Sequence, residues 1–274
     1  MRQSIRCVKL VGAGNDFILV DGRVEKITRK KALAALAVKI CDRNFGLGAD
    51  GLLVIEGSKK ADARMRTFNA DGSEAEMCGN ALRCFAYYLA GARKSARKSL
   101  TIETVAGLIQ AHVHGDRIKA KLTAPKDLKL DIPLAVSGRV LKVSFINTGV
   151  PHAVIRVQGL GTVDVEGLGR LIRFHEAFKP AGTNVDFYEV MGPDAIRVRT
   201  YERGVEAETL ACGTGSTAAA LVSSLKLDRN IGIVNVLTQS KEVLKVHFTR
   251  TTGGFRNVWM EGQASLVWKG EYYG

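Results

Sequence analysis

Two stretches of this chain repeat one pattern, in which a cysteine stands where a turn enters a run of helix-forming residues. The first stretch centres on Cys78 and the second on Cys212. In each, a glutamate stands four residues before the cysteine and a glycine directly follows it. The repeat predicts a chain built from two halves, each with a thiol at the start of a helix.

The start of a helix is a favourable place for a thiolate. Its first turn leaves backbone N–H groups unpaired and carries positive partial charge. We therefore expect a lowered pKa for each thiol and anion binding beside it. Burial as a small apolar residue is the alternative for Cys212. Two such thiols, one from each half, favour a site in which a substrate meets one sulfur on each face.

The cysteine pattern argues against disulfides and against zinc. An odd number of cysteines at irregular spacing fits reduced thiols, and no signal-like apolar segment follows Met1, so the cytoplasm is expected. Cys78 and Cys84 have no further Cys or His pair at metal-ligand spacing, so no metal is expected. Cys84 lies on the apolar stripe of the helix that follows Cys78, which predicts a core position.

The chain carries a formal charge of +13, which raises the question of nucleic acid. Its basic residues are scattered, however, and the densest runs are 26–31 and 93–98. Neither run contains the interleaved aromatic residues typical of single-strand binders. A solvated basic surface is therefore expected, without a nucleic-acid partner. No apolar run approaches the ~20 residues of a membrane span, so no membrane association is expected.

Strand-like and helix-like segments alternate along the chain and predict an α/β (α+β) fold. The turn 12–15 lies between two strand-like segments and so is not a dinucleotide-binding loop, which would enter a helix. Residues 125–133 are polar and turn-rich, and we interpret them as the crossing between the halves.

The sequence lacks residues that other cysteine-based reactions require, and this limits the reactions that the two thiols can catalyse. A cysteine hydrolase needs a histidine base, and His152 could serve one cysteine but does not explain two. The C-x-x-C motif of thioredoxin-like proteins is absent. Two opposed thiols suit proton transfer at a carbon: one sulfur removes a proton from one face while the other delivers a proton to the opposite face. Such a reaction inverts a stereocentre.

Taken in order, these stretches resemble the diaminopimelate epimerase family over essentially the whole chain. The motifs that carry the resemblance are Gly12–Phe17, Asn69–Glu74, Cys78–Asn80, Gly149–His152, Gly182–Val185, Tyr201–Gly204 and Cys212–Gly215. The resemblance implies two similar domains, each a barrel-like, mostly antiparallel sheet around a central helix, with the active site in the cleft between them. The implied halves are residues 1–128, joined by a C-terminal strand at 264–274, and residues 129–263.

The resemblance also implies a function. Members of this family are cofactor-independent isomerases, usually homodimeric, that interconvert LL- and meso-diaminopimelate for lysine and peptidoglycan synthesis. If the roles of the family's residues are transferred to the matching motifs of this chain, Cys78 and Cys212 would be the acid/base pair. His152 and Glu202 would then adjust the reactivity of these thiols. The substrate-binding residues would be Gly79, Asn80, Gly213 and Thr214 at the reacting carboxylate, and Asn15, Asn69, Asn184, Glu202 and Arg203 at the distal end.

Some positions depart from the family pattern. Gly51 and Val150 stand where some members use amides, so no substrate contact is expected there. The segment 205–208 before the second cysteine is one residue longer than the commoner form, which leaves the path of this loop open. Two other functions stay open: epimerisation of another amino acid on the same fold, and nucleic-acid binding as a side function of the run 93–98.

Overall fold

The computed structural model describes residues 4–75, 77–92, 99–227 and 232–274. The chain forms two compact units. Unit 1 comprises Met1–Ala120 and Gly262–Gly274, and unit 2 comprises Lys121–Glu261. The basic run 93–98 lies outside the described residues.

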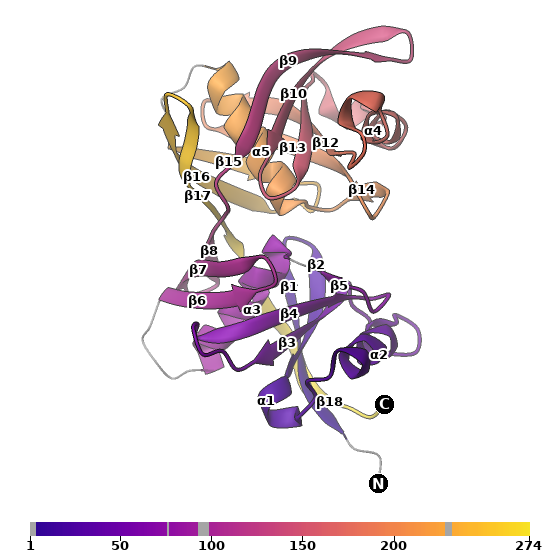
Figure 1. Cartoon of the computed structure of the whole chain (residues 1–274), viewed down its shortest axis with the longest axis vertical. Coiled ribbons are helices and arrows are strands. Elements are labelled where there is room, and N and C mark those ends of the chain that lie inside the picture. Colours follow the sequence, from indigo (N-terminus) through magenta and orange to yellow (C-terminus); the bar gives the residue numbers. More distant parts are fainter. Residues whose placement is uncertain (1–3, 76, 93–98, 228–231) are drawn as a thin grey trace. The chain divides into compact units, whose positions relative to one another are not determined.

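Unit 1 is a sheet wrapped around one helix, α3 (Figure 1). Its strands pair antiparallel except at β2–β3 and β4–β6, which are parallel. Helix α3 packs against β1, β2, β4, β6, β7 and β18, while α2 covers the outer side of β3 and β4. The elements are β1 (Ile5–Gly12), β2 (Asn15–Asp21), α1 (Gly22–Glu25), α2 (Lys30–Cys41), β3 (Gly51–Glu56), β4 (Ala63–Asn69), β5 (Glu74–Ala75), α3 (Gly79–Ala92), β6 (Ser99–Thr104), β7 (Gly107–His114), β8 (Arg117–Lys121) and β18 (Ser265–Tyr272).

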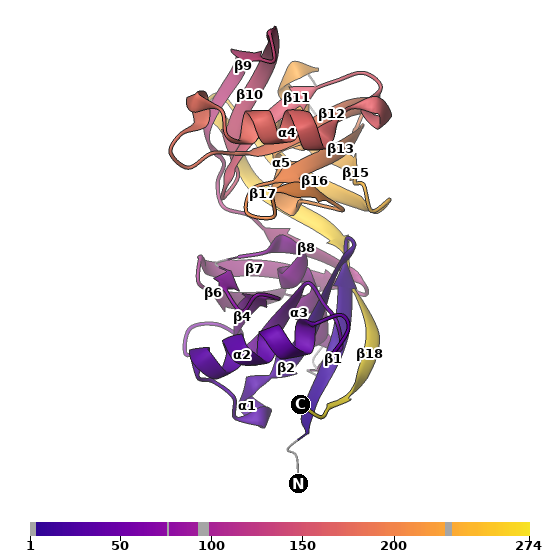
Figure 2. The ribbon, with the colours of Figure 1, turned by 90° about the vertical axis from the view of Figure 1, so that its right-hand side faces the viewer.

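Unit 2 repeats this design around helix α5. Helix α5 packs against β10, β11, β12, β13, β15 and β16, and α4 lies on the outer side of β12 and β13 (Figure 2). The elements are β9 (Lys126–Val136), β10 (Arg139–Asn147), β11 (Pro151–Arg156), η1 (Leu160–Thr162), α4 (Val165–Arg173), η2 (Glu176–Phe178), β12 (Asn184–Gly192), β13 (Ala195–Glu202), β14 (Ala207–Thr209), α5 (Gly213–Lys226), β15 (Ile233–Leu237), β16 (Val243–Thr251) and β17 (Gly254–Gln263).

The strand pairings of the two units correspond one to one. The order β1-β2-β3-β4, with its parallel β2–β3 step, matches β10-β11-β12-β13, with its parallel β11–β12 step. The two units differ in the origin of the outer strand. Strand β10 pairs with β9, which precedes it in the chain, whereas β1 pairs with β18, which follows unit 2. The prediction of two similar domains with mostly antiparallel sheets around a central helix is confirmed.

The prediction of a turn-rich crossing at 125–133 was wrong. Residues 126–133 belong to strand β9, which pairs antiparallel with β10, and the whole range lies within unit 2. The strand exposes most of its side chains, and two aspartates in it, Asp127 and Asp131, have positive φ where the register shifts. A polar strand that contains proline and irregular pairing has the composition of a loop, which explains the error.

A buried core explains the enclosure of each helix. On α3, Leu82, Phe85 and Leu89 are fully buried against apolar side chains of the surrounding strands. Cys84 is also fully buried in this cluster, as predicted. Apolar contacts with the surrounding strands therefore hold helix α3 inside its sheet.

An arginine holds the glutamate that precedes each cysteine. In unit 1, Arg66 on β4 donates to both carboxylate oxygens of Glu74 at 2.6 and 3.1 Å. In unit 2, Arg199 on β13 donates to both oxygens of Glu208 at 2.7 and 2.6 Å. Bidentate pairs of this kind fix geometry as well as charge. Each pair ties the short strand before the cysteine to the long strand beside it.

Removing one of these arginines should destabilise the fold. Arg66→Met leaves a mostly buried carboxylate with Lys30 as its remaining ion-pair partner, so we expect a loss of about 3 kcal/mol in the free energy of unfolding. Arg64→Met is the matched control, because the Arg64 side chain is 42% exposed and lies 3.8 Å from Glu56, and it should cost less than about 1 kcal/mol. Urea denaturation of both variants measures the difference, and equal losses would contradict the role given to Arg66.

Candidate active site

Cys78 stands at the start of the central helix of unit 1. Helix α3 begins at Gly79, and the backbone carbonyl of Cys78 accepts the first helical hydrogen bond, from the N–H of Leu82 at 2.9 Å. The side chain is half-buried. The predicted position of this thiol at a helix start is therefore confirmed.

An amide network lies beside this helix start. The Asn80 amide donates to the side-chain oxygen of Asn15 at 2.6 Å, and the Asn15 amide donates to the Asp50 carboxylate at 2.8 Å. The fully buried Arg83 donates to the side-chain oxygen of Asn80 at 2.8 Å. The structure thus brings together two of the predicted substrate-binding residues, Asn15 and Asn80. Sequence reasoning missed their partners Asp50 and Arg83.

Asn69 lies at the same end of the sheet. It is the last residue of β4 and pairs with Gly51, the first residue of β3, while Asn15 is the first residue of β2. Its amide donates to the Ser73 hydroxyl at 2.9 Å, and its backbone N–H donates to the Ser73 carbonyl at 2.8 Å. These bonds hold Asn69 in the turn that leads towards the cysteine.

Cys212 caps the central helix of unit 2. It has extended backbone angles, and its sulfur accepts a hydrogen bond from the N–H of Gly215 at 3.4 Å. The Thr214 hydroxyl also lies 3.4 Å from the sulfur. Gly213 and Thr214 form the first turn of α5, where the carbonyl of Thr214 accepts from the Thr148 hydroxyl at 3.0 Å. Cys212 is only 7% exposed.

The expectation of a lowered pKa is wrong for Cys212. Burial raises the pKa of this thiol well above its ordinary value, and the carboxylates of Glu202 and Asp186 raise it further. The hydrogen bonds from Thr214 and Gly215 act in the opposite direction but are the weaker influence. The helix start supplies positive partial charge, but the surrounding packing removes water and places two acids near the sulfur. At neutral pH Cys212 is therefore a thiol.

His152 and Asp186 form a buried pair close to this helix. The Nδ1 atom of His152 lies 2.7 Å from the Asp186 carboxylate, and the Thr200 hydroxyl donates to the same carboxylate at 2.7 Å. A carboxylate only accepts, so Nδ1 carries the proton. The Nε2 atom of His152 is buried and has no hydrogen-bond partner among the described residues. Sequence reasoning missed Asp186, although its position two residues after Asn184 places both on one face of β12.

Glu202 is the last residue of β13 and occupies the position that Asn69 has in unit 1. Burial raises the pKa of its carboxyl group, and the negative charge of Asp186 adds to this effect. The chain reverses direction directly after Glu202, where the N–H of Glu206 donates to the Glu202 carbonyl at 2.8 Å. The hydroxyl of Tyr201 donates to the Glu206 carbonyl at 2.9 Å, which ties the segment 205–208 to strand β13.

Asn184 anchors Arg203. The Asn184 side-chain oxygen accepts from the backbone N–H of Arg203 at 2.8 Å, and its amide donates to the Pro151 carbonyl at 3.0 Å. One guanidinium N–H of Arg203 donates to the Ala181 carbonyl at 3.1 Å. The predicted residues Asn184 and Arg203 are therefore in direct contact.

The strands next to the two helix starts correspond in position but differ in their side chains. The matching strand registers place Phe17 of unit 1 at the position of His152 in unit 2, and Leu53 at the position of Asp186. Phe17 and Leu53 belong to the apolar core around α3. The two thiols thus have similar backbones around them but unlike side chains.

The described residues give no indication of a metal site or of a membrane-spanning helix. Within the described ranges, no three His, Cys, Asp or Glu side chains are grouped as a metal site would require. No helix in the described part of the chain is both long enough and apolar enough to cross a membrane.

Comparison with known proteins gives a consistent result. The sequence model of the family described as diaminopimelate epimerase matches residues 7–126 and 144–267. A protein named diaminopimelate epimerase from Aquifex aeolicus is 44% identical over 96% of this chain and 95% of its own length. One of the same name from Archaeoglobus fulgidus is 41% identical over 97% and 95%.

Solved structures share the fold at lower identity. A PhzF-family phenazine biosynthesis protein from Bacillus anthracis has a TM-score of 0.78 at 19% identity and covers 98% of this chain and 99% of its own. A probable proline racemase from Agrobacterium radiobacter has a TM-score of 0.70 at 16% identity and covers 97% and 92%. These two similarities concern the fold.

The raised pKa of Cys212 predicts an effect of Glu202. Glu202→Gln removes a carboxylate that disfavours the thiolate, so the pKa of Cys212 should fall and its alkylation should begin at lower pH. Peptide-resolved mass spectrometry after iodoacetamide pulses across a pH series measures this midpoint. The exposed Glu176 supplies the control, Glu176→Gln, which should leave the midpoint unchanged. An unmoved midpoint in Glu202→Gln would contradict the electrostatic coupling.

Proposed function

The chain belongs to the diaminopimelate epimerase family, and on this premise we propose that it interconverts LL- and meso-diaminopimelate by proton transfer between Cys78 and Cys212. The observation that carries the proposal is the repeated device itself: each unit presents a cysteine at the first turn of the helix that its sheet encloses. One thiol alone would serve one face of a carbon, and two serve both.

The proposed reaction proceeds at the α-carbon of the substrate. The thiolate of one cysteine takes the α-hydrogen as a proton, and the electron pair left on carbon delocalises into the adjacent carboxylate. The thiol of the other cysteine then gives its proton to the opposite face, which inverts the configuration and leaves the second sulfur as the thiolate. In this proposal the halves 1–128 with 264–274 and 129–263 bring their sulfurs to the two sides of a shared cleft.

The state of Cys212 supports a role as proton donor. Its raised pKa keeps the proton on sulfur until a carbanion-like charge appears nearby. Glu202 and His152 are proposed to tune this thiol, since Glu202 raises its pKa and the pair His152–Asp186 lies buried close by. In the reverse direction the same sulfur acts as the base.

The helix starts are proposed to bind the reacting carboxylate. Backbone N–H groups of the first turns, at Gly79 and Asn80 in unit 1 and at Gly213 and Thr214 in unit 2, point along the helix axes and stabilise negative charge. Because charge on the carboxylate grows as the proton leaves, these groups also stabilise the transition state.

The remaining residues are proposed to recognise the distal amino-acid end. Arg203 offers a planar fork for a carboxylate, Glu202 accepts from an ammonium group, and the amides of Asn15, Asn69 and Asn184 donate or accept. A substrate with a second amino-acid head group explains this set better than a simpler amino acid. Epimerisation of another amino acid remains the alternative, and a substrate screen of the purified protein decides between the two.

We further propose that the protein works as a homodimer in the cytoplasm without an added organic cofactor or metal. The family membership supports this, and the reduced cysteines suit a reducing compartment. A coupled assay with purified protein and LL-diaminopimelate, with no pyridoxal phosphate added, tests the cofactor proposal directly.

The two-thiol mechanism predicts a labelling pattern. In D₂O the product takes its proton from a solvent-equilibrated thiol, so product should carry deuterium from its first appearance while recovered substrate carries little. Cys78→Ala and Cys212→Ala should each lower kcat at least about 10³-fold, and the double variant should lose little more because both groups act in one relay. Cys84→Ala is the control for loss of a buried thiol. Near wild-type turnover in either single variant would refute the mechanism.

The distal-end proposal predicts a role for Arg203. Arg203→Lys keeps the charge but loses the planar fork, so KM for diaminopimelate should rise about tenfold or more. Arg197→Lys, on the same strand β13 but outside the proposed site, should leave KM unchanged. Steady-state kinetics of both variants measures the effect, and an unaltered KM and kcat in Arg203→Lys would remove Arg203 from the site.

A further inference from the structure

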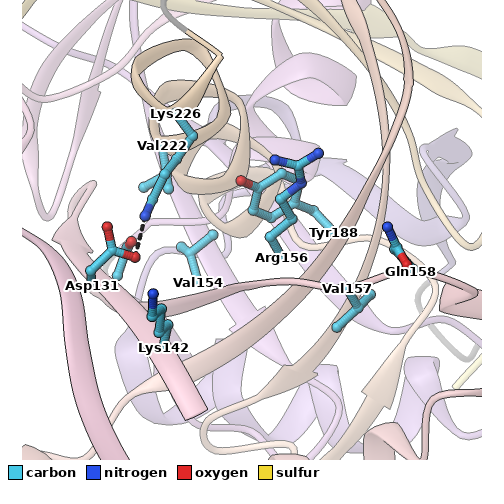
Figure 3. Close-up of a pocket in the computed structure, with 10 residues that line it drawn as sticks. Asp131, Lys142, Val154, Arg156, Val157, Gln158, Tyr188, Val222 and Lys226 are labelled. Atoms are coloured by element: carbon cyan, nitrogen blue, oxygen red, sulfur yellow. Dashed lines mark hydrogen bonds and ion pairs between the residues drawn. The ribbon is translucent and has the colours of Figure 1, made fainter.

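Unit 2 contains a pocket that the proposed reaction does not use. It has a volume of about 420 Å³ and lies between strands β9 to β12 and the last turns of α5 (Figure 3). That volume falls in the range of small-molecule sites. Cys212 precedes the first turn of α5, whereas Val222 and Lys226, which line the pocket, belong to its last turns. The pocket is therefore at the other end of the helix from the thiol.

The lining of the pocket includes a buried hydroxyl group, that of Tyr188, for which the described residues provide no hydrogen-bond partner. Tyr188 is 1% exposed, and its hydroxyl has no hydrogen-bond partner among the described residues. Burial raises the pKa of Tyr188 to about 12, so the group remains a donor at neutral pH. A buried hydroxyl without a partner is costly and uncommon in native structures. An acceptor atom placed in the pocket would satisfy it.

The rim of the pocket is positively charged. Lys142 and Arg156 line it and form no ion pair with any described carboxylate, while Lys226 pairs with Asp131. Arg156 is directly opposite Tyr188 in the parallel pairing of β11 and β12, and Figure 3 draws both side chains towards the pocket. One acid against three bases leaves an excess of positive charge around the Tyr188 hydroxyl.

Unit 1 has different side chains at the positions that correspond to this pocket. By strand register, Ile55 of unit 1 occupies the position of Tyr188, so the polar group is absent there. Tyr88 and Val222 each stand ten residues after the cysteine of their helix. Unit 1 thus has a bulky aromatic side chain, packed against its core, where unit 2 has a small one.

The charge pattern also differs between the units. The residue of unit 1 that corresponds to Arg156 is Asp21, which is neutralised by a salt bridge from Arg23 at 2.6 Å. At the matching positions unit 1 therefore has Asp21 in an ion pair and the ring of Tyr88, in place of Arg156 and Val222. Arg156 and Tyr188 therefore have no counterparts of the same kind in unit 1.

We propose that this pocket binds a small organic anion through a carboxylate or phosphate group. The group accepts hydrogen bonds from the Tyr188 hydroxyl and the Arg156 guanidinium, and Lys142 contributes charge at the rim. Arginine and a tyrosine hydroxyl both donate well to such oxygens. The proposal concerns binding alone and does not depend on the reaction proposed above.

Calorimetric titration of the full-length protein at constant ionic strength tests the proposal, with inorganic phosphate and glutarate as separate probes. At least one probe should bind saturably, and the stronger one identifies the headgroup class. Arg156→Gln should raise its Kd about tenfold or more, and Tyr188→Phe several-fold. Arg256→Gln removes an exposed charge from β17 of the same unit, outside the pocket, and should leave Kd unchanged.

Thermal unfolding separates binding from folding. Because the Tyr188 hydroxyl has no hydrogen-bond partner among the described residues, Tyr188→Phe should keep or raise the Tm of the protein without a probe. It should also lose most of the Tm increase that the probe gives the wild type. No saturable binding of either probe, or equal affinity in Arg156→Gln, Tyr188→Phe and Arg256→Gln, would overturn the proposal.

Discussion

The enclosure of each central helix by its own sheet is the constraint on which the rest of this structure depends. Helices α3 and α5 each contact six strands of their own sheet, and these contacts oppose any shift of the helix. The first turn of each helix is therefore held at a defined place, and the preceding cysteine with it. The ends of neighbouring strands supply the polar residues of that region: Asn15 and Asn69 in unit 1, and Asn184 and Glu202 in unit 2.

The duplication preserves backbone geometry and lets side-chain chemistry diverge. In unit 1 the strands under α3 present Phe17 and Leu53, which give it an apolar core. In unit 2 the equivalent positions hold His152 and Asp186, a buried pair that requires its own hydrogen bonds. A pair of proton-transfer groups with different surroundings is easier to hold in different protonation states than two identical ones. Divergence between the halves is therefore useful for the proposed reaction.

Local features of the sequence were sufficient to predict much of this arrangement. The cysteine at each helix start, the turn at 12–15 and the buried Cys84 all follow from patterns within a few residues. The pKa of Cys212 could not be predicted in this way, because burial and the acids near it come from distant parts of the chain.

The features that were missed share a cause. Asp186 is one of two acidic residues in strand β12, and nothing in the adjacent sequence reveals its histidine partner 34 residues away. Strand β9 has the composition of a loop, and only its pairing with β10 makes it a strand. The arginines that hold Glu74 and Glu208 lie on other strands and are ordinary residues in sequence. Long-range pairing decides each of these cases.

The outer strand of unit 2, β9, precedes its partner in the chain, whereas the outer strand of unit 1, β18, is the last strand of the chain. This difference affects the order in which the two units can fold during synthesis. All strands of unit 2 follow one another in the chain, so its sheet can close as soon as β17 has left the ribosome. Strand β1 is made among the first segments, but its neighbour β18 is made only after all of unit 2. The edge of β1 that pairs with β18 therefore has no partner strand through most of translation. The half of the protein that is begun first is completed last.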